Sequence, residues 1–191
     1  MTLKHLWLAA SLVLTTLSVT AQTSATPAAL PPVTTIAALN VQRYMGTWYE
    51  IAKFPNRFQA KCTANTRAQY LVQTDGSIQV LNSCIATDGS TIDALGLAKQ
   101  VGPATSPKLQ VRFAPAWLSF LPMVWGDYWV IDLDADYQLA AVSDAKREYL
   151  WVLSRTPKVD AKVYGALLER LNAQSFDVHK LELTTQTSAT R

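Results

Sequence analysis

The sequence predicts an all-β fold, an eight-stranded, up-and-down antiparallel barrel with one C-terminal helix packed outside it and a short ninth strand. Between Gly46 and Ser154 the chain consists of short β-rich runs separated by turn residues, with no helix-length amphipathic segment among them. The runs alternate apolar and polar residues, as strands with one buried face do. Trp48 lies in the first run and Arg155 follows the last. Barrel closure would therefore place a guanidinium over an indole ring.

Residues 1–21 are expected to be a cleaved secretory signal peptide. Lys4 and His5 precede an apolar run of about 14 residues, and small residues suited to a signal peptidase follow it. A membrane-spanning helix needs about 20 apolar residues, so this run favours export over anchoring. The chain has no cysteine near the expected cleavage point, where a bacterial lipoprotein carries its lipid.

The remaining chain is expected to form one domain. Residues 22–38 are rich in Thr, Ala and Pro and are predicted to be a disordered lead-in. Residues 39–184 have the length of a single domain with its own core, and residues 185–191 are a C-terminal tail. The net charge of +3 falls to about +2 when Lys4 leaves, and no basic cluster is present, which argues against a nucleic-acid partner.

The order of runs and turns predicts sequential hairpins. Asp75-Gly76 and Asp88-Gly89 supply residues that tight reversals require. Eight such strands lose their exposed edges by closing into a barrel, and a barrel of this size can hold one small ligand. The strands are expected at residues 46–53, 63–72, 77–86, 91–101, 108–113, 127–133, 138–143 and 149–154.

A helix is expected only after the eighth strand. Thr156 is the predicted N-cap and Pro157 the first helical residue. Its apolar stripe should dock on the outside of the barrel, and residues 177–183 could return along the sheet as the ninth strand. The stripe is expected to consist of Val159, Val163, Leu167 and Leu171.

The two cysteines, Cys62 and Cys84, are expected to form a disulfide because an even count follows a secretory signal. A metal-binding or nucleophilic role is the minority alternative. The hairpin at Asp75-Gly76 places them near each other, although in a regular hairpin the two cysteines would be a few residues out of register. A bulge, or a position of Cys62 in the preceding loop, would bring the Cα atoms within bonding range.

Three segments carry a family resemblance. Residues 40–52 contain Gly46 and Trp48, residues 130–137 contain Asp134 and Tyr137, and residues 149–157 contain Arg155. In this order they resemble the three motifs of the lipocalins, specifically the bacterial outer-membrane lipocalin group related to apolipoprotein D and plant temperature-induced lipocalins. The resemblance implies a lipocalin barrel in which these five residues are a structural signature, with Trp48 and Arg155 at the closed end.

The resemblance also implies an internal cavity for a fatty acid, a lysophospholipid or a similar hydrophobic compound. Apolar walls would supply affinity, while Asn82 or a Tyr hydroxyl could orient a head group. For each position, packing in the closed-end core is the alternative to ligand contact. The candidate ligand-binding residues are Tyr70, Val80, Asn82, Leu109, Val111, Phe113, Tyr128 and Val130.

Residues 114–125 contain no charge, and hairpin counting places them at the open end. Trp117, Phe120 and Trp125 are therefore predicted to lie at the cavity mouth. Three interpretations remain open: a lid packed on the barrel, a ligand portal that also touches a membrane surface, and a dimer contact.

The sequence favours a binding protein without cofactor, metal or catalytic residues. It has no Gly-x-Ser-x-Gly motif, and His179 is the only histidine after the signal segment. Asp132, Asp134 and Asp136 imitate the start of a calcium loop, but Tyr137 stands where the loop needs Gly, so turn residues are the simpler interpretation.

We therefore expect a carrier of a small hydrophobic ligand with a role in envelope lipid storage or transport. Export would leave it in the periplasm as a monomer or weak homodimer, not anchored through an N-terminal Cys, with peripheral outer-membrane association left open. One alternative is a lipocalin-scaffold enzyme acting on a lipid or isoprenoid. The other is a membrane-surface or partner-binding protein that uses residues 114–125.

Overall fold

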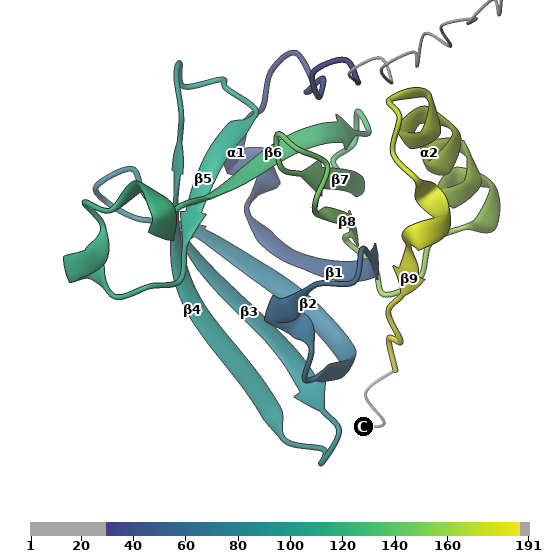
Figure 1. Cartoon of the computed structure of the whole chain (residues 1–191), viewed down its shortest axis with the longest axis horizontal. Helices are drawn as coiled ribbons and strands as arrows, with labels where there is room; N and C mark the ends of the chain where they lie inside the picture. The colour runs from purple at the N-terminus through teal and green to yellow at the C-terminus, as the bar shows by residue number, and fades with distance from the viewer. Residues whose placement is uncertain (1–29, 188–191) are drawn as a thin grey trace, which may run out of the picture.

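The computed structural model describes residues 30–187 and shows a closed antiparallel barrel with a helix on one side (Figure 1). Each strand pairs with its sequence neighbours, and the barrel closes because β1 pairs with both β8 and β2. The eight barrel strands begin and end within one residue of their expected positions. They are β1 (Gly46–Lys53), β2 (Cys62–Val72), β3 (Ile78–Ala86), β4 (Thr91–Gln100), β5 (Lys108–Arg112), β6 (Gly126–Leu133), β7 (Leu139–Ser143) and β8 (Leu150–Ser154).

A short helix, α1 (Val41–Tyr44), precedes β1 and covers one end of the barrel. Beside it, the Arg155 guanidinium carbon lies 4.0 Å from the ring centre of the fully buried Trp48, as the sequence predicts. Arg155 also donates hydrogen bonds to the carbonyl oxygens of Thr47, Arg43 and Tyr137. One side chain thus joins the first strand, α1 and the β6–β7 turn, and this end is closed.

Gly46 occupies a position at the closed end that other residues would strain. Its φ of 92° lies in the left-handed region, and a Cβ there would lie 3.4 Å from Nη1 of Arg155. Asp134 and Tyr137 stabilise the neighbouring β6–β7 turn. The Asp134 carboxylate accepts the backbone N–H groups of Asp136 and Gln138, and the Tyr137 hydroxyl accepts the N–H of Asn40.

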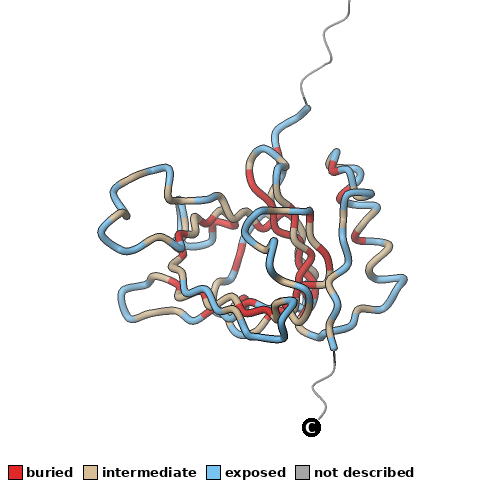
Figure 2. Tube along the Cα trace, turned by 60° about the horizontal axis from the view of Figure 1, so that its bottom comes forward, coloured by how far each residue is buried: buried red, intermediate tan, exposed pale blue. Residues whose placement is uncertain are grey.

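Alternating strand residues build two separate cores. One fills the barrel around Trp48 and Tyr70, and the other lies between the barrel wall and α2 (Ala161–Ala173), where Leu167 and Leu171 are fully buried. Buried residues follow the strands, whereas the connecting loops are mostly exposed (Figure 2). None of the helices in residues 30–187 combines the length and apolar composition that spanning a bilayer requires.

The predicted start of the outer helix is wrong. The N-cap is Asp160, whose carboxylate accepts the N–H groups of Lys162 and Val163, whereas the Thr156 hydroxyl donates to the carbonyl of Lys158 in the preceding turn. A carboxylate that accepts two helical N–H groups is the stronger cap.

The predicted apolar stripe is only partly right. Val159 lies before the helix but packs, with Tyr164, against the outer core, the arrangement of a hydrophobic staple. Val163 is 50% exposed, so the docking face is carried by Leu167 and Leu171 instead.

The ninth strand is shorter than predicted. A 3-10 turn, η4 (Val178–Lys180), occupies most of the expected range, and β9 is only Glu182–Leu183. Its pairing partners on β1 are Ala52 and Lys53, and antiparallel pairing of Glu182 with Lys53 places residues 177–181 beyond the end of β1. The available edge therefore limits the strand.

The expected signal segment and residues 22–29 lie outside the described residues. The rest of the expected lead-in, residues 30–38, packs on the barrel, so disorder is the wrong prediction there. Val33 is 6% exposed in the outer core, and the N–H of Ile36 donates to the carbonyl of Val130. Arg147 donates a further hydrogen bond to the carbonyl of Pro31.

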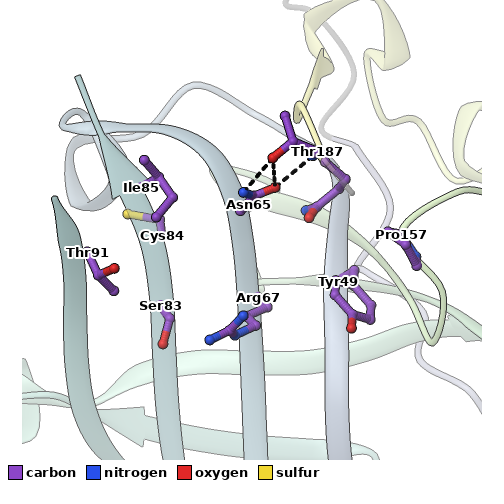
Figure 3. Close-up of a pocket in the computed structure, with 10 residues that line it drawn as sticks. Tyr49, Asn65, Arg67, Ser83, Cys84, Ile85, Thr91, Pro157 and Thr187 are labelled. Carbon is purple, nitrogen blue, oxygen red and sulfur yellow. Dashed lines mark hydrogen bonds between the residues drawn. The ribbon is translucent and has the colours of Figure 1, made fainter. Parts of the chain in front are cut away.

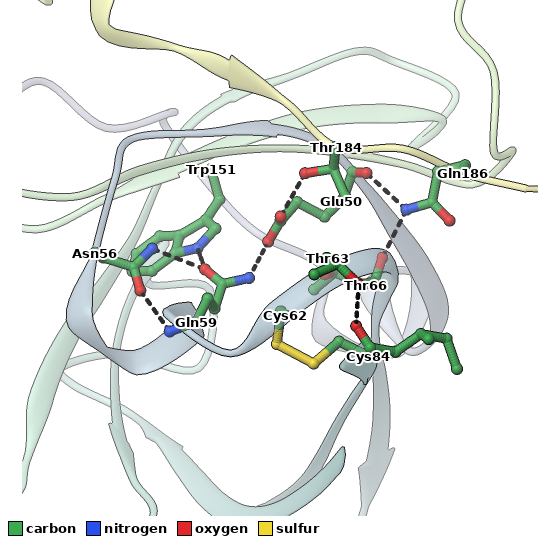
Figure 4. The surroundings of a disulfide bond; sticks show 11 residues. Glu50, Asn56, Gln59, Cys62, Thr63, Thr66, Cys84, Trp151, Thr184 and Gln186 are labelled. Atoms are coloured by element: carbon green, nitrogen blue, oxygen red, sulfur yellow. Dashed lines mark hydrogen bonds between the residues drawn. A yellow bond between two sulfur atoms is a disulfide. The ribbon is translucent and has the colours of Figure 1, made fainter. Parts of the chain in front are cut away.

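The predicted disulfide between Cys62 and Cys84 is present, with a Cα–Cα distance of 5.6 Å (Figure 4). The β2–β3 register shifts twice between Cys62 and Arg67, which supplies the bulges that strict pairing required. Because Cys62 begins β2 and Cys84 lies near the end of β3, the bond joins two strands at the open end of the barrel.

Candidate functional site

On β4, β5 and β6 the inward-facing positions change from buried to exposed along the barrel axis. On β4, which pairs with β3, Ala98 is buried, Gly96 is half-buried and Ala94 is exposed towards the open end. On β3 the series runs from buried Val80 to half-buried Asn82, and Cys84, nearer the open end, is buried at the disulfide. The closed half is therefore filled by buried side chains, while inward positions of β4, β5 and β6 near the open end are exposed to solvent.

Three tyrosines lie at the boundary between the halves. The Tyr128 hydroxyl lies 2.8 Å from that of Tyr44 and 2.9 Å from that of Tyr70. Burial raises the pKa of Tyr70 to about 12 and holds the pKa values of Tyr44 and Tyr128 well above the ordinary one. All three phenols therefore stay neutral at physiological pH.

Three neutral hydroxyls carry three protons, and the two hydrogen bonds between them use two. The third proton remains available for an acceptor, and of the three residues only Tyr128 is half-buried and not buried. The tyrosine cluster, Tyr44, Tyr70 and Tyr128, can thus donate one hydrogen bond to a polar atom that reaches the base of the open half.

At the open end, Phe113 lies against Gly96. Its ring carbons would come within 2.7 Å of a Cβ at Gly96, so only glycine allows the ring this position. Phe113 is 44% exposed and half-buried Val111 precedes it on the inward face. These residues supply an apolar wall near the rim.

A buried carboxyl group closes the gap where β1 and β2 separate. The β1–β2 pairing ends at Tyr49, and the Glu50 side chain accepts hydrogen bonds from Gln59 Nε2 and Thr184 Oγ1 (Figure 4). Gln59, in the 3-10 turn η1 (Arg57–Gln59), accepts the indole N–H of Trp151 in turn. Burial raises the pKa of Glu50.

The C-terminal segment completes this closure from outside. The amide of Gln186 donates to the carbonyls of both Glu50 and Thr66, and the carbonyl of Thr185 accepts the N–H of Asn65. Residues 185–187, expected to belong to a tail, therefore bridge β1 and β2.

Residues 114–125 extend from the barrel between β5 and β6, on the side opposite α2 (Figure 1). They form two 3-10 turns, η2 (Ala116–Leu118) and η3 (Pro122–Val124). Trp117 and Phe120 are 73% and 74% exposed, so neither packs on the barrel as a lid would. Trp125 instead lies beside Lys99, whose Nζ is 4.2 Å from the ring centre.

The outer wall of the barrel carries a separate hollow of about 310 Å³. Tyr49, Arg67 and Ser83 project into it from three neighbouring strands, and Asn65 binds Thr187 at its edge (Figure 3). These residues occupy the outward alternation, so this hollow is distinct from the barrel interior.

The predicted ligand-binding residues divide between the two halves. Tyr70, Val80, Leu109 and Val130 belong to the buried core, with Val111 and Tyr128 packed against it. Asn82 and Phe113 lie nearer the rim.

The sequence interpretation missed Tyr44 and Glu50, which the alternation of the first strand and its lead-in could have marked as inward. It also missed Gln59 and Trp151, for which no local pattern gives a signal.

Comparison with known proteins supports the fold. A family model described as a lipocalin-like domain matches residues 39–186. Temperature-induced lipocalin-1 of Arabidopsis thaliana is 43% identical over 153 residues, covering 79% of this chain and 81% of the relative. Outer membrane lipoprotein Blc of Escherichia coli K12 is 37% identical over 153 residues, covering 78% and 82%.

Among solved structures, insecticyanin of the tobacco hornworm Manduca sexta superposes with a TM-score of 0.66 at 18% identity, covering 86% of this chain and 89% of that one. This likeness concerns the fold. Together with the family-model match and the two relatives, it shows that the chain belongs to the lipocalins, a family of generally non-enzymatic proteins that bind small hydrophobic ligands.

Proposed function

We propose that this protein binds and carries a fatty acid, a lysophospholipid or a similar single-chain lipid in the open half of its barrel. The observation that carries the proposal is the change from buried to exposed among inward-facing residues. A barrel packed throughout would leave no room for a ligand, and one that was open throughout would lack a base.

The rim and the base of the open half of the barrel differ in chemistry in a way that fits an amphiphile. Val111 and Phe113 offer apolar surface, and each Å² of apolar area removed from water contributes about 25 cal/mol. The tyrosine cluster offers one hydrogen-bond donor at the base. A long apolar chain matches the apolar wall, whereas a small polar metabolite would leave it unmatched.

Mass spectrometry of lipid extracted from natively purified protein tests the proposal. We expect single-chain lipids in near-stoichiometric amount, and displacement of a fluorescent fatty acid by the recovered compound. Recovery of no lipid, together with no displacement, would refute the carrier function. Turnover of the recovered compound would replace it with the enzymatic alternative.

A second candidate function is contact with a membrane surface through residues 114–125. The exposed side chains of Trp117, Phe120 and Met123 favour it, since Met123 is 85% exposed and the segment has no charge. We further propose a periplasmic location with peripheral outer-membrane association and a role in envelope lipid storage or transport. The Escherichia coli relative's name, outer membrane lipoprotein, supports the location.

A further inference from the structure

Arg112, the last residue of β5, is a buried side chain with unused hydrogen-bonding capacity. Only 7% of it is exposed, and its Nε is buried without a hydrogen-bond partner. Its Nη1 donates to the carbonyl of Ala114. Burying a guanidinium without a partner is costly, because the charge loses its water and gains nothing in return.

The groups around Arg112 do not neutralise it. The guanidinium carbon lies 5.3 Å from the Trp125 ring centre, and Lys99 approaches the same ring. Within residues 30–187, no carboxylate lies within ion-pair distance of Arg112. An aromatic ring compensates a cation only in part, and a second cation nearby adds to the positive potential. The site therefore lacks one negative charge.

A hollow of about 350 Å³ adjoins Arg112 at the rim of the barrel, on its outer side, because Leu97 and Arg112 follow the outward alternation, opposite to Ala98 and Val111. The β4–β5 pairing stops at Leu97 and Arg112, so β4 continues to Thr91 without β5 beside it. Apart from Arg112, the side chains that line this rim pocket are apolar. They belong to Leu95, Leu97, Phe113, Ala114, Pro115 and Ala116.

Another arginine of this chain, Arg170, shows how a guanidinium binds a carboxylate through Nε and Nη2. Arg170 binds Asp132 through Nε at 2.7 Å and Nη2 at 2.9 Å, one hydrogen bond to each carboxylate oxygen. The same pair of nitrogens in Arg112 makes no hydrogen bond to any described residue. Because Nε has no surface open to solvent, an anion reaches this guanidinium through Nη2, by one charge-assisted hydrogen bond.

We propose that Arg112 is an anion-binding residue at the barrel rim that receives the carboxylate or phosphate of an amphiphilic ligand. The first carbons of the ligand's chain lie against Phe113, whose ring covers the inward side of Gly96, and the rest of the chain enters the open half. This inference rests on the proposed function and deepens it, because it selects acidic single-chain lipids over neutral ones.

Isothermal titration calorimetry with three probes tests the inference: oleate, oleyl alcohol and oleoyl lysophosphatidic acid. The alcohol has the same chain without the charge. We expect Arg112→Gln to weaken both acidic probes by about tenfold or more, the worth of one charge-assisted hydrogen bond, and to change oleyl alcohol binding less than about twofold. Arg112→Lys should recover part of the loss. Retained alcohol binding shows that the variant is folded.

Arg67→Gln is the matched control, because Arg67 also lines a hollow but is exposed on the outer wall. It should leave all three affinities unchanged. Three results would each overturn the Arg112 site. Arg112→Gln could lose as much affinity for the alcohol as for the acids, it could lose no affinity for any probe, or Arg67→Gln could lose affinity for the acids in its place. Absence of binding of any probe to the unmodified protein would overturn the proposed function itself.

Inorganic phosphate separates a lipid head group from a free anion. We expect no heat of binding with phosphate alone, because the apolar walls contribute nothing to it. Arg112-dependent binding of phosphate without binding of the acidic lipids would overturn the amphiphile assignment.

Discussion

The closed and open ends of this barrel are built from the same strands but hold their residues in different ways. At the closed end, Trp48 is fully buried beneath Arg155, and the guanidinium also satisfies three backbone carbonyls. At the open end, another guanidinium, that of Arg112, is buried with an unpartnered nitrogen, and large apolar side chains stand in solvent. Polar groups with hydrogen-bond partners stabilise the fold, whereas polar groups without partners are available to a ligand.

The comparison predicts that closed-end substitutions reduce stability, and Trp48→Ala should do so most. Deleting a buried aromatic side chain costs about 4 kcal/mol in the free energy of unfolding, through lost burial and the cavity left behind. Urea unfolding measures the loss. Trp117→Ala deletes the same side chain at a site that is 73% exposed and should change stability by less than about 0.5 kcal/mol. Similar losses in both variants would erase the distinction between the ends.

The disulfide is a covalent link at the open end, and removing it tests how much this end contributes to stability. Joining Cys62 to Cys84, 22 residues apart, should stabilise the fold by about 3 kcal/mol by constraining the unfolded chain. The double Cys62→Ser, Cys84→Ser variant should lose this amount in urea unfolding. Reductant should lower the stability of the unmodified protein and leave the double variant unchanged. A reductant-insensitive unmodified protein would contradict the prediction.

The barrel was predictable from sequence because alternation and turn residues are local signals. Strand limits follow from them, the Trp48–Arg155 contact follows from closing the barrel, and the disulfide was predicted from the even number of cysteines after a secretory signal. The start of α2 could not be predicted from sequence. Thr156-Pro157 and Asp160 both resemble helix starts, and only the docking of the helix decides between them. Tertiary packing likewise orders residues 30–38, whose composition alone predicts disorder.

The candidate site was less predictable, for a related reason. Alternation identifies inward residues but not the height at which the interior stops being filled, so it does not show that Val80 is buried and Asn82 half-buried. Arg112 reads as an ordinary outward-facing polar residue of a strand. Its burial depends on the path of residues 113–125, which carry Trp125 back over β4 and β5.

Glu50 places a titratable group at the seam between β1 and β2. Burial raises its pKa, while hydrogen bonds from Thr184 and Gln59 and the charge of Lys53 oppose the shift in part. A raised folded-state pKa contributes stability that is present below the unfolded-state value and lost as pH rises through the folded-state value. The unfolding free energy should therefore fall as pH rises from about 4.5, the ordinary pKa of Glu, through the raised pKa of Glu50 in the folded state.

Urea unfolding at a series of pH values measures this dependence. Glu50→Gln cannot ionise and should show a flatter profile, with its stability relative to the unmodified protein improving as pH rises. Glu182→Gln is the control, because Glu182 is exposed and pairs with Lys53 on the same strand edge. Parallel profiles for Glu50→Gln and the unmodified protein would show that Glu50 does not carry the effect.

The smallest effect on stability is expected for residues 114–125. Replacing Trp117 and Phe120 by Ser removes apolar side chains that are already in water, so the free energy of unfolding should change by less than about 0.5 kcal/mol. Cosedimentation with vesicles of phosphatidylethanolamine and phosphatidylglycerol should fall by about tenfold or more, since each aromatic side chain contributes roughly 1.5 to 3 kcal/mol when buried.

Leu71→Ser is the matched control for this double variant. Leu71 is 60% exposed on β2, near the closed end, and its loss should leave vesicle binding unchanged. Unchanged vesicle binding of the double variant with a fall in thermal stability would instead identify the segment as a lid. A shift from dimer to monomer in sedimentation equilibrium would identify a dimer contact. The exposure of Trp117 and Phe120 favours the membrane outcome, because a lid gains its stability only by covering such side chains.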